Sequence, residues 1–182
     1  MAVEGSFALD TPFDIERLYI RQERAGDVNE IGLLTAKAFA PMPFASGTEA
    51  SITEALRATG ALAVSLVAMA GDELVGHVAF SPVTIDGRPG TWYQLGPIAV
   101  APQTQRRGVG SALIASGLDR LRELQAGGCV LLGNPGYYGR FGFLSDRALT
   151  YQGRPRRVFQ GLVLNGVPMT GDVRLHPAFD VS

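Results

Sequence analysis

The sequence predicts an α/β fold built on a mixed β-sheet with helices on both of its faces. Three observations predict it: two amphipathic helical segments come early, three apolar segments joined by short turns follow, and a strand, a glycine loop, a long helix and another strand come next. Strands joined by short turns pair antiparallel, whereas strands separated by a helix pair parallel. This order favours a mostly antiparallel sheet with a central parallel pair over uniformly alternating strands and helices.

The chain begins its regular structure with a strand and two helices. Residues 18–23 alternate well enough for a first strand, and apolar positions between 28 and 39 take helical spacing. Pro41 and Pro43 end that helix, and a second one is expected over residues 48–60, where Gly60 stops it. We therefore expect a strand followed by two amphipathic helices.

The next segments predict an antiparallel meander and then a parallel crossover. Strands are expected over residues 62–70, 73–80 and 91–100, with Gly71-Asp72 and the stretch from Asp86-Gly87 through Gly90 as the turns. A long helix over about 108–125 leads to a buried strand at 129–132, which runs parallel to its predecessor. Two later strands, at 149–151 and 158–164, complete the sheet.

Size and composition indicate one domain and exclude several classes of function. The chain has 182 residues with a net charge of −1, so we expect a single domain over 17–182, an N-terminal extension over 1–16 and no nucleic-acid partner. No apolar run reaches the roughly 18 to 20 residues of a membrane span, and the N-terminus lacks a basic leader, so a cytoplasmic location without membrane contact is expected. One cysteine and two histidines supply no metal site.

A glycine loop follows the strand that ends at Val100. After Gly108 and Gly110 the apolar spacing becomes helical, and such a junction presents backbone N–H groups at the positive end of a helix dipole. The loop therefore predicts a pyrophosphate site. An NTPase loop would need four residues between the glycines and a lysine after them, whereas one residue separates Gly108 from Gly110 and no lysine follows. A dinucleotide fingerprint would need a third glycine at position 113, which is a leucine here. The alternative is that the glycines serve turn geometry alone.

The run Gln105-Arg106-Arg107-Gly108-Val109-Gly110, after a strand and opening a helix, closely resembles the pyrophosphate loop of the GNAT N-acetyltransferase superfamily. The resemblance covers about residues 18–164. It implies the GNAT-like acyl-CoA N-acyltransferase fold, in which two central parallel strands splay apart to admit the pantetheine arm of acetyl-CoA. It also implies a set of residues that bind this acetyl donor: Ile98, Ala99, Val100, Gln105, Arg106, Arg107, Gly108, Val109, Gly110, Ser111 and Asn134.

A second motif follows the 129–132 strand. Asn134 and Pro135 suit the cap and first turn of a short helix that ends at Gly142. The superfamily's tyrosine lies four residues before the glycine of a Gly-Phe pair, which places Tyr138 at the position of the general acid that protonates the thiolate leaving group. Tyr137 is assigned to the pocket wall or the core. For Asn134, capping of this helix and binding of the cofactor are equally good explanations.

The base that deprotonates the amine has no clear candidate. Many relatives carry a glutamate on the strand before the phosphate loop, whereas this strand reads Tyr93-Gln94-Leu95-Gly96-Pro97. His77 on the adjacent strand is chemically suited to the task, and its alternative is a core or surface histidine. Ordered water or an amine already neutral when bound would serve as well. Cys129 starts an apolar strand without an adjacent base, which favours a structural thiol over an acyl-cysteine mechanism.

Together these features predict an N-acetyltransferase that moves an acetyl group from acetyl-CoA to a primary amine of a small molecule or peptide by direct attack. The alternatives are a non-catalytic acyl-CoA-binding sensor and an interaction domain without cofactor. In the GNAT fold the first two helices border the acceptor side, so Phe39, Met42 and Phe44 are candidates to line the substrate pocket, with core packing as the other account. The sequence leaves the acceptor open, and a monomer or a homodimer is expected.

Overall fold

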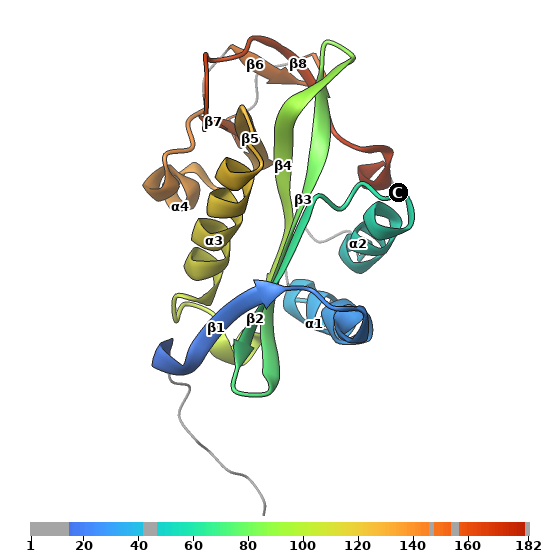
Figure 1. Cartoon of the computed structure of the whole chain (residues 1–182), viewed down its shortest axis with the longest axis vertical. Helices are drawn as coiled ribbons and strands as arrows, with labels where there is room; N and C mark the ends of the chain where they lie inside the picture. Colours follow the sequence, from blue (N-terminus) through green and yellow to red (C-terminus); the bar gives the residue numbers. More distant parts are fainter. Residues whose placement is uncertain (1–14, 42–46, 146–147, 154–156, 181–182) are drawn as a thin grey trace, which may run out of the picture.

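The computed structural model describes residues 15–41, 47–145, 148–153 and 157–180, and within them a single sheet of eight strands runs through the molecule (Figure 1). The main path of the sheet has the order β1-β2-β3-β4-β5-β7, with β8 pairing to β3 and β6 pairing to β8. The strands are β1 (Leu18–Gln22), β2 (Val64–Ala70), β3 (Glu73–Ile85), β4 (Arg88–Val100), β5 (Gly128–Leu132), β6 (Leu149–Tyr151), β7 (Phe159–Val163) and β8 (Gly171–Arg174).

The predicted antiparallel meander of three strands is formed by β2, β3 and β4, and β1 adds to its edge. β1 pairs with β2, β2 with β3 and β3 with β4, all antiparallel. The turn between β3 and β4 is tighter than predicted, because Ile85 pairs directly with Arg88 and only Asp86 and Gly87 lie between them. Both turn residues have positive φ, 51° and 72°, which is the backbone geometry of a two-residue hairpin.

The parallel pair of the sheet is short and then opens. β4 and β5 pair over three positions only, from Trp92↔Gly128 to Gln94↔Val130. Beyond Gln94 the register of β4 with β3 shifts, since Phe80 pairs with Leu95 whereas Val78 pairs with Ile98. The one extra residue on β4 bends the strand in the manner of a β-bulge. β4 therefore continues to Val100 paired with β3 but separated from β5, and the predicted splayed pair is confirmed.

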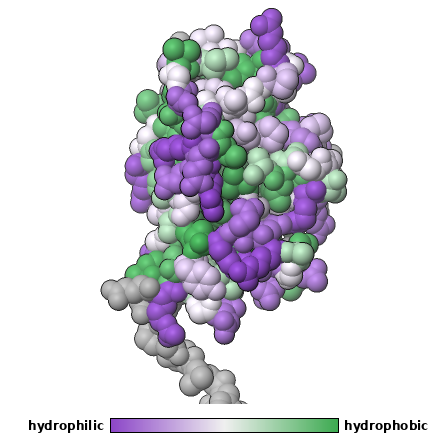
Figure 2. Space-filling view, viewed as in Figure 1, coloured by the Kyte–Doolittle hydropathy of each residue, from purple (hydrophilic) through white to green (hydrophobic). Residues whose placement is uncertain are grey.

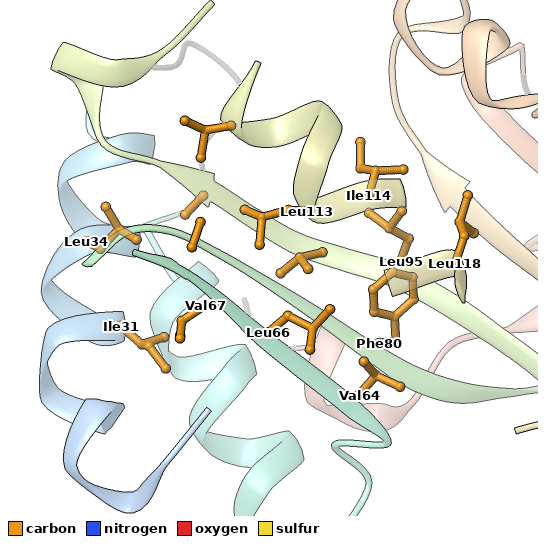
Figure 3. Packing of buried hydrophobic residues seen from close by; sticks show 14 of the residues in the cluster. Ile31, Leu34, Val64, Leu66, Val67, Phe80, Leu95, Leu113, Ile114 and Leu118 are labelled. Atoms are coloured by element: carbon orange, nitrogen blue, oxygen red, sulfur yellow. The ribbon is translucent and has the colours of Figure 1, made fainter. Parts of the chain in front are cut away.

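The long helix α3 (Val109–Glu123) covers one face of the sheet. Glycines on α3 and on β3 allow the helix to lie close to the sheet. A Cβ at Gly117 of α3 would lie 2.3 Å from the Phe80 ring, and a Cβ at Gly76 of β3 would lie 2.8 Å from Leu113 Cδ1. Figure 3 shows Leu113, Ile114 and Leu118 of α3 directed at the sheet. The short helix α4 (Pro135–Tyr138) lies beside α3 (Figure 1).

The other face of the sheet carries α1 (Val28–Phe39) and α2 (Glu49–Ala58), with the 3-10 helix Pro177–Phe179 packed against α2. Ile31 and Leu34 of α1 pack on the sheet from this side (Figure 3). Helices thus lie on both faces, as predicted. Further 3-10 helices span Ile15–Arg17, Ala25–Asp27, Pro102–Thr104 and Gly139–Phe141.

The late strands differ from the sequence prediction in their pairing. β7 pairs antiparallel with β5 as an edge strand, but β6 pairs parallel with β8, a strand near the C-terminus that the sequence pattern did not predict. Val173 of β8 is fully buried in a second, smaller core with Trp92, Val130 and Phe159. Four residues of mixed polarity give too weak a pattern for a strand prediction; this strand is fixed by the contacts of Val173.

The surface mixes hydrophobic and hydrophilic residues (Figure 2). In Figure 2 the hydrophobic area on the face shown is divided into small regions by hydrophilic residues. Among the helices in the described ranges, none has both the length and the apolar composition needed to span a membrane.

Candidate active site

The loop between β4 and α3 places the first turn of α3 beside the end of β4. Gly108 precedes the helix with φ of 90°, a left-handed conformation that favours glycine, and its carbonyl accepts the N–H of Ala112 at 2.9 Å. The N–H groups of Val109, Gly110 and Ser111 come before this first bond of the helical pattern. They therefore point outward at the positive end of the helix dipole, where an anion binds.

Tyr137 of α4 forms one wall of this loop. Its hydroxyl oxygen lies 3.5 Å from Ser111 Oγ, and a Cβ at Gly110 would come within 3.2 Å of it. The guanidinium of Arg140 lies 4.7 Å from the centroid of the Tyr137 ring, and Arg140 Nε donates to the Tyr137 carbonyl at 3.0 Å. The sequence assigned Tyr137 to pocket wall or core; only the packing of α4 against α3 places its hydroxyl at the phosphate loop.

The side chains of the loop have different surroundings. Gln105 Nε2 donates to the Val100 carbonyl at 3.1 Å, which ties the loop to the end of β4. Arg106 and Arg107 are exposed, and Arg106 has φ of 59°. The two guanidinium groups thus add positive charge at the loop surface.

The β4 segment next to the loop lies at the opened side of the sheet. Ile98 and Val100 are half-buried, whereas Ala99 is buried. Val100 faces α3, since its Cγ2 would lie 3.6 Å from a Cβ at Gly110. Because side chains alternate along a strand, Ile98 shares that face and Ala99 points to the other.

Tyr138 lies at the end of β5, on the same side of the sheet as α3. Its ring covers Gly133, where a Cβ would approach Cε2 to 2.3 Å, and packs edge-on against Phe143 with ring centroids 6.1 Å apart. Burial, with a smaller contribution from Tyr137, raises the pKa of Tyr138 to about 12. The phenol therefore keeps its proton at neutral pH, as a proton donor must.

The other sequence candidates that fall within the described residues belong to α4, α1 and β5. Asn134 caps α4, with its Oδ1 accepting the Gly136 N–H at 2.9 Å. Phe39 ends α1 half-buried against the main core. Met42 and Phe44 lie outside the described residues. Cys129 is fully buried in β5, and burial raises the pKa of its thiol well above the ordinary value.

His77 belongs to a buried polar network on the face opposite α3. Its Nε2 lies 2.8 Å from Ser65 Oγ, and Ser65 donates to Glu23. Arg57 of α2 holds the same carboxylate through two bonds of 2.6 and 3.0 Å. Glu23, Ser65 and Arg57 also line a pocket of about 380 Å³. Sequence spacing could not reveal this network, because it joins the residue that follows β1 to residues of β2, β3 and α2.

The network fixes the state of the imidazole. The Ser65 hydroxyl donates its hydrogen bond to Glu23, so its oxygen accepts the hydrogen bond from His77. His77 Nε2 therefore carries the hydrogen, and Nδ1 carries the lone pair. Burial lowers the pKa of His77 and outweighs the raising effect of Glu23. Burial would raise the pKa of Glu23, but bonds from His77, Arg57 and Ser65 outweigh it and lower the pKa to about 2. The pair is therefore a neutral histidine beside a carboxylate that is paired with arginine.

Comparisons with known proteins agree with this geometry. The sequence model of the Acetyltransferase (GNAT) family matches residues 35–143, more than half of the chain. The chain therefore belongs to the GNAT acetyltransferase family.

Two solved structures are similar over nearly the whole chain. A GNAT family acetyltransferase from Brucella melitensis, in complex with acetyl-CoA, is 44% identical with a TM-score of 0.80, covering 90% of this chain and 98% of that one. The N-acetyltransferase YhbS from Escherichia coli, in complex with CoA, is 33% identical with a TM-score of 0.81, covering 91% and 93%.

The match to curated sequences is shorter. Escherichia coli K12 YhbS, described as an uncharacterized N-acetyltransferase, is 39% identical over 101 residues, or 55% of this chain. The matched region spans 60% of the length of that relative.

Proposed function

We propose that this protein transfers an acetyl group from acetyl-CoA to a primary amine by direct attack of the amine on the thioester. The observation that carries the proposal is the gap between β4 and β5, which opens after Gln94. The start of α3 lies at one side of this gap, and Tyr138 lies just beyond the end of β5. An extended pantetheine arm fits beside a strand without a partner on that side.

The loop residues have the chemistry that the donor requires. In this proposal, the N–H groups of Val109, Gly110 and Ser111 bind the pyrophosphate, and Arg106 and Arg107 add charge. The absence of a Cβ at Gly110 keeps the approach open beside Tyr137. Ile98 to Val100 pair with the pantetheine amides, and Asn134 borders the same gap from α4.

Tyr138 is the proposed acid, and His77 is the proposed base. Attack by the amine breaks the thioester C–S bond, and the phenol proton of Tyr138 goes to the leaving thiolate. His77 offers its Nδ1 lone pair as a base, and its strand neighbour on β4 is Ala99. Since the His77 side chain is fully buried, proton transfer to it requires the acceptor or a water to reach the sheet face between α1 and β4.

The acceptor pocket is proposed at the same face. Phe39 ends α1, and the segment that follows contains the candidates Met42 and Phe44. The panel of amines in the experiment below tests which amine is the acceptor.

Calorimetric titration with acetyl-CoA, followed by thiol release against a panel of amines, tests the proposal. We expect saturable binding and amine-dependent release of CoA thiol. Gly110→Trp should abolish binding because the indole fills the space over the loop, whereas Gly90→Trp, at an exposed position with no atom within 4 Å of its Cβ site, should bind normally. Binding without turnover of any amine would favour the sensor, and no binding would refute the loop assignment.

A further inference from the structure

A buried amide joins the start of β7 to the end of β5. Gln160 of β7 is 1% exposed and is the register partner of Leu131 in β5. Its Nε2 donates to the Gly133 carbonyl at 3.1 Å and makes a longer contact of 3.5 Å with the Val158 carbonyl. The Gly133 N–H donates to the same Val158 carbonyl at 2.8 Å. Both backbone groups of Gly133 are therefore held by residues at the start of β7.

The Gly133 carbonyl depends on this amide for its hydrogen bond. Gly133 comes after the last pair of the β5–β7 ladder, Leu132↔Phe159, so the ladder supplies no donor for its oxygen. Within the described ranges, Gln160 Nε2 is the one group that donates to it. The orientation of the Gly133 carbonyl consequently depends on the Gln160 side chain.

The two carbonyls also account for an unpartnered atom. In the part of the chain that the structure describes, Gln160 Oε1 is buried without a hydrogen-bond partner. The carbonyls of Gly133 and Val158 both accept, and only the NH2 end of the amide can donate to the two of them. The amide therefore turns its NH2 end toward Gly133, which leaves its oxygen unpartnered. Because such atoms are uncommon in folded proteins, the arrangement points to a requirement for the Gly133 contact.

The ring of Tyr138 lies against the same glycine. A Cβ at Gly133 would come within 2.3 Å of Tyr138 Cε2 and 3.2 Å of Leu131 Cδ1. Leu131 and its register partner Gln160 share one face of the sheet, so the ring covers Gly133 on the face from which the amide holds it. Phe143 packs edge-on against the ring. A rotation or shift of the Gly133 peptide would therefore displace the phenol.

We propose that Gln160 is a positioning residue for Tyr138: by holding the Gly133 carbonyl, its amide fixes the place of the phenol ring beyond the end of β5. This inference rests on the proposed function, in which Tyr138 protonates the leaving thiolate. A general acid must lie within hydrogen-bond reach of the atom that it protonates, so a displaced ring transfers its proton less often. Gln160 lies beyond residues 35–143, the region that the GNAT family model matches.

The position of the ring can be measured without turnover. In protein with ¹³C-labelled tyrosine rings, the NMR signals of Tyr138 are assigned by their loss in Tyr138→Phe. We expect these signals to shift in Gln160→Met, which fills a similar volume without a donor, because the ring moves relative to Phe143. The signals of Tyr19, an exposed tyrosine of β1, should stay in place. Tyr138 signals that also stay in place would overturn the proposal, whether or not the protein acetylates any amine.

Kinetics with the amine of highest turnover provide the second measurement. We expect Gln160→Met to lower kcat about 10- to 100-fold, as a small misplacement of a reacting group does, with the Kd for acetyl-CoA unchanged. A normal kcat in Gln160→Met together with a low kcat in Tyr138→Phe would refute the positioning role. A normal kcat in both variants would instead remove Tyr138 from the mechanism, and this inference with it.

Gln160→Glu separates the hydrogen bond from the packing. Its side chain has the same shape, but a carboxyl group donates to the Gly133 carbonyl only while it holds its proton. The kcat of Gln160→Glu should therefore approach that of the wild type at low pH and that of Gln160→Met at high pH. Equal kcat values for these two variants at every pH would exclude the hydrogen bond as the cause.

Thr35→Val is the matched control, since it removes another buried side-chain bond to a backbone carbonyl, that of Ile31 within α1. It should leave kcat and the Tyr138 signals unchanged. The same loss of kcat in Thr35→Val and Gln160→Met would assign the effect to lowered stability and contradict the proposal. Gln160→Glu serves as the second variant if Gln160→Met folds poorly, as judged from its Tm.

Discussion

At the scale of single residues, burial sets the chemistry of the two proposed catalytic groups. The phenol of Tyr138 is largely enclosed by Gly133, Phe143 and Tyr137, so its pKa rises to about 12. Burial acts on His77 in the opposite direction and keeps the imidazole neutral. One residue thus retains a proton to donate, and the other retains a lone pair to accept one.

Tyr138→Phe should lower kcat about 10²- to 10⁴-fold, the usual contribution of a positioned general acid, and leave the Kd for acetyl-CoA unchanged. Steady-state kinetics and calorimetry measure the two quantities. Tyr19→Phe, at an exposed tyrosine of β1, is the control. Gly133→Ala should also lower kcat, because its Cβ displaces the Tyr138 ring. A normal kcat in Tyr138→Phe would remove this residue from the mechanism.

The stability of the protein should fall below about pH 6.5 through His77. Its folded pKa is lowered, so on acidification the unfolded chain binds this proton first, and the free energy of unfolding decreases by at most about 1.4 kcal/mol per pH unit. Glu23, with its pKa lowered from 4.5 to about 2, adds a further loss below about pH 4.5. Urea unfolding at several pH values measures both effects.

His77→Gln should flatten the upper part of this pH dependence, because glutamine can still donate to Ser65 but does not titrate. His176→Gln is the control, as the other histidine of the chain, whose Nδ1 accepts the Ala178 N–H. The same slope in His77→Gln and wild type would place the titrating group elsewhere. The acetylation rate of His77→Gln separately tests its role as base, since an unchanged rate excludes that role.

At the scale of elements, close contact between α3 and the sheet holds the phosphate loop in place. Gly117 and Gly76 allow this contact, and the first turn of α3 therefore lies next to the end of β4. The bulge in β4 has the complementary effect, since it separates β4 from β5 at the point where the donor is proposed to enter.

Two helix glycines should respond to alanine with opposite signs. Gly117→Ala should cost about 1–3 kcal/mol of unfolding free energy, because its Cβ would overlap the Phe80 ring in a packed core. Gly32→Ala should stabilise by up to about 1 kcal/mol, because only Glu54 Oε1, at 4.0 Å, is near its Cβ position and alanine favours the helix. Denaturant titration compares both variants with wild type; equal effects would contradict the packing described for α3.

At the scale of the whole molecule, the proposed donor should contact β4, α3 and α4 at once, so its binding should stabilise the fold. At about 100 times its Kd, acetyl-CoA should add about 2.7 kcal/mol, which raises the Tm of a domain of this size by about 5–10 °C. Thermal unfolding with and without acetyl-CoA measures the shift. Gly110→Trp should show none, and a wild-type Tm that does not move would argue against donor binding.

The sequence by itself determined the features that depend on neighbouring residues. Helical spacing and turn residues predicted α1, α2, α3 and the meander, and the spacing from Gln105 to Gly110 identified the family before any contact was known. The short helix around Tyr138 also followed from local signals, since Asn134, Pro135 and Gly142 are cap, first-turn and stop residues. These signals come from residues that are close together in the sequence, and they do not depend on contacts with distant segments.

Only the tertiary structure decided which distant residues meet. The network of Glu23, Ser65 and His77 joins residues 12 to 54 positions apart, and the hydroxyl of Tyr137 beside Ser111 joins residues 26 positions apart. The strand β8 likewise depends on its pairing with β3 and β6. Strand register and bulges fix the contacts between strands, because a shift of one residue would turn a side chain to the other face of the sheet. The packing of α4 beside α3 fixes the contact of Tyr137 with Ser111. Register is set by the packing of the whole core, and for this reason local sequence patterns did not reveal these contacts.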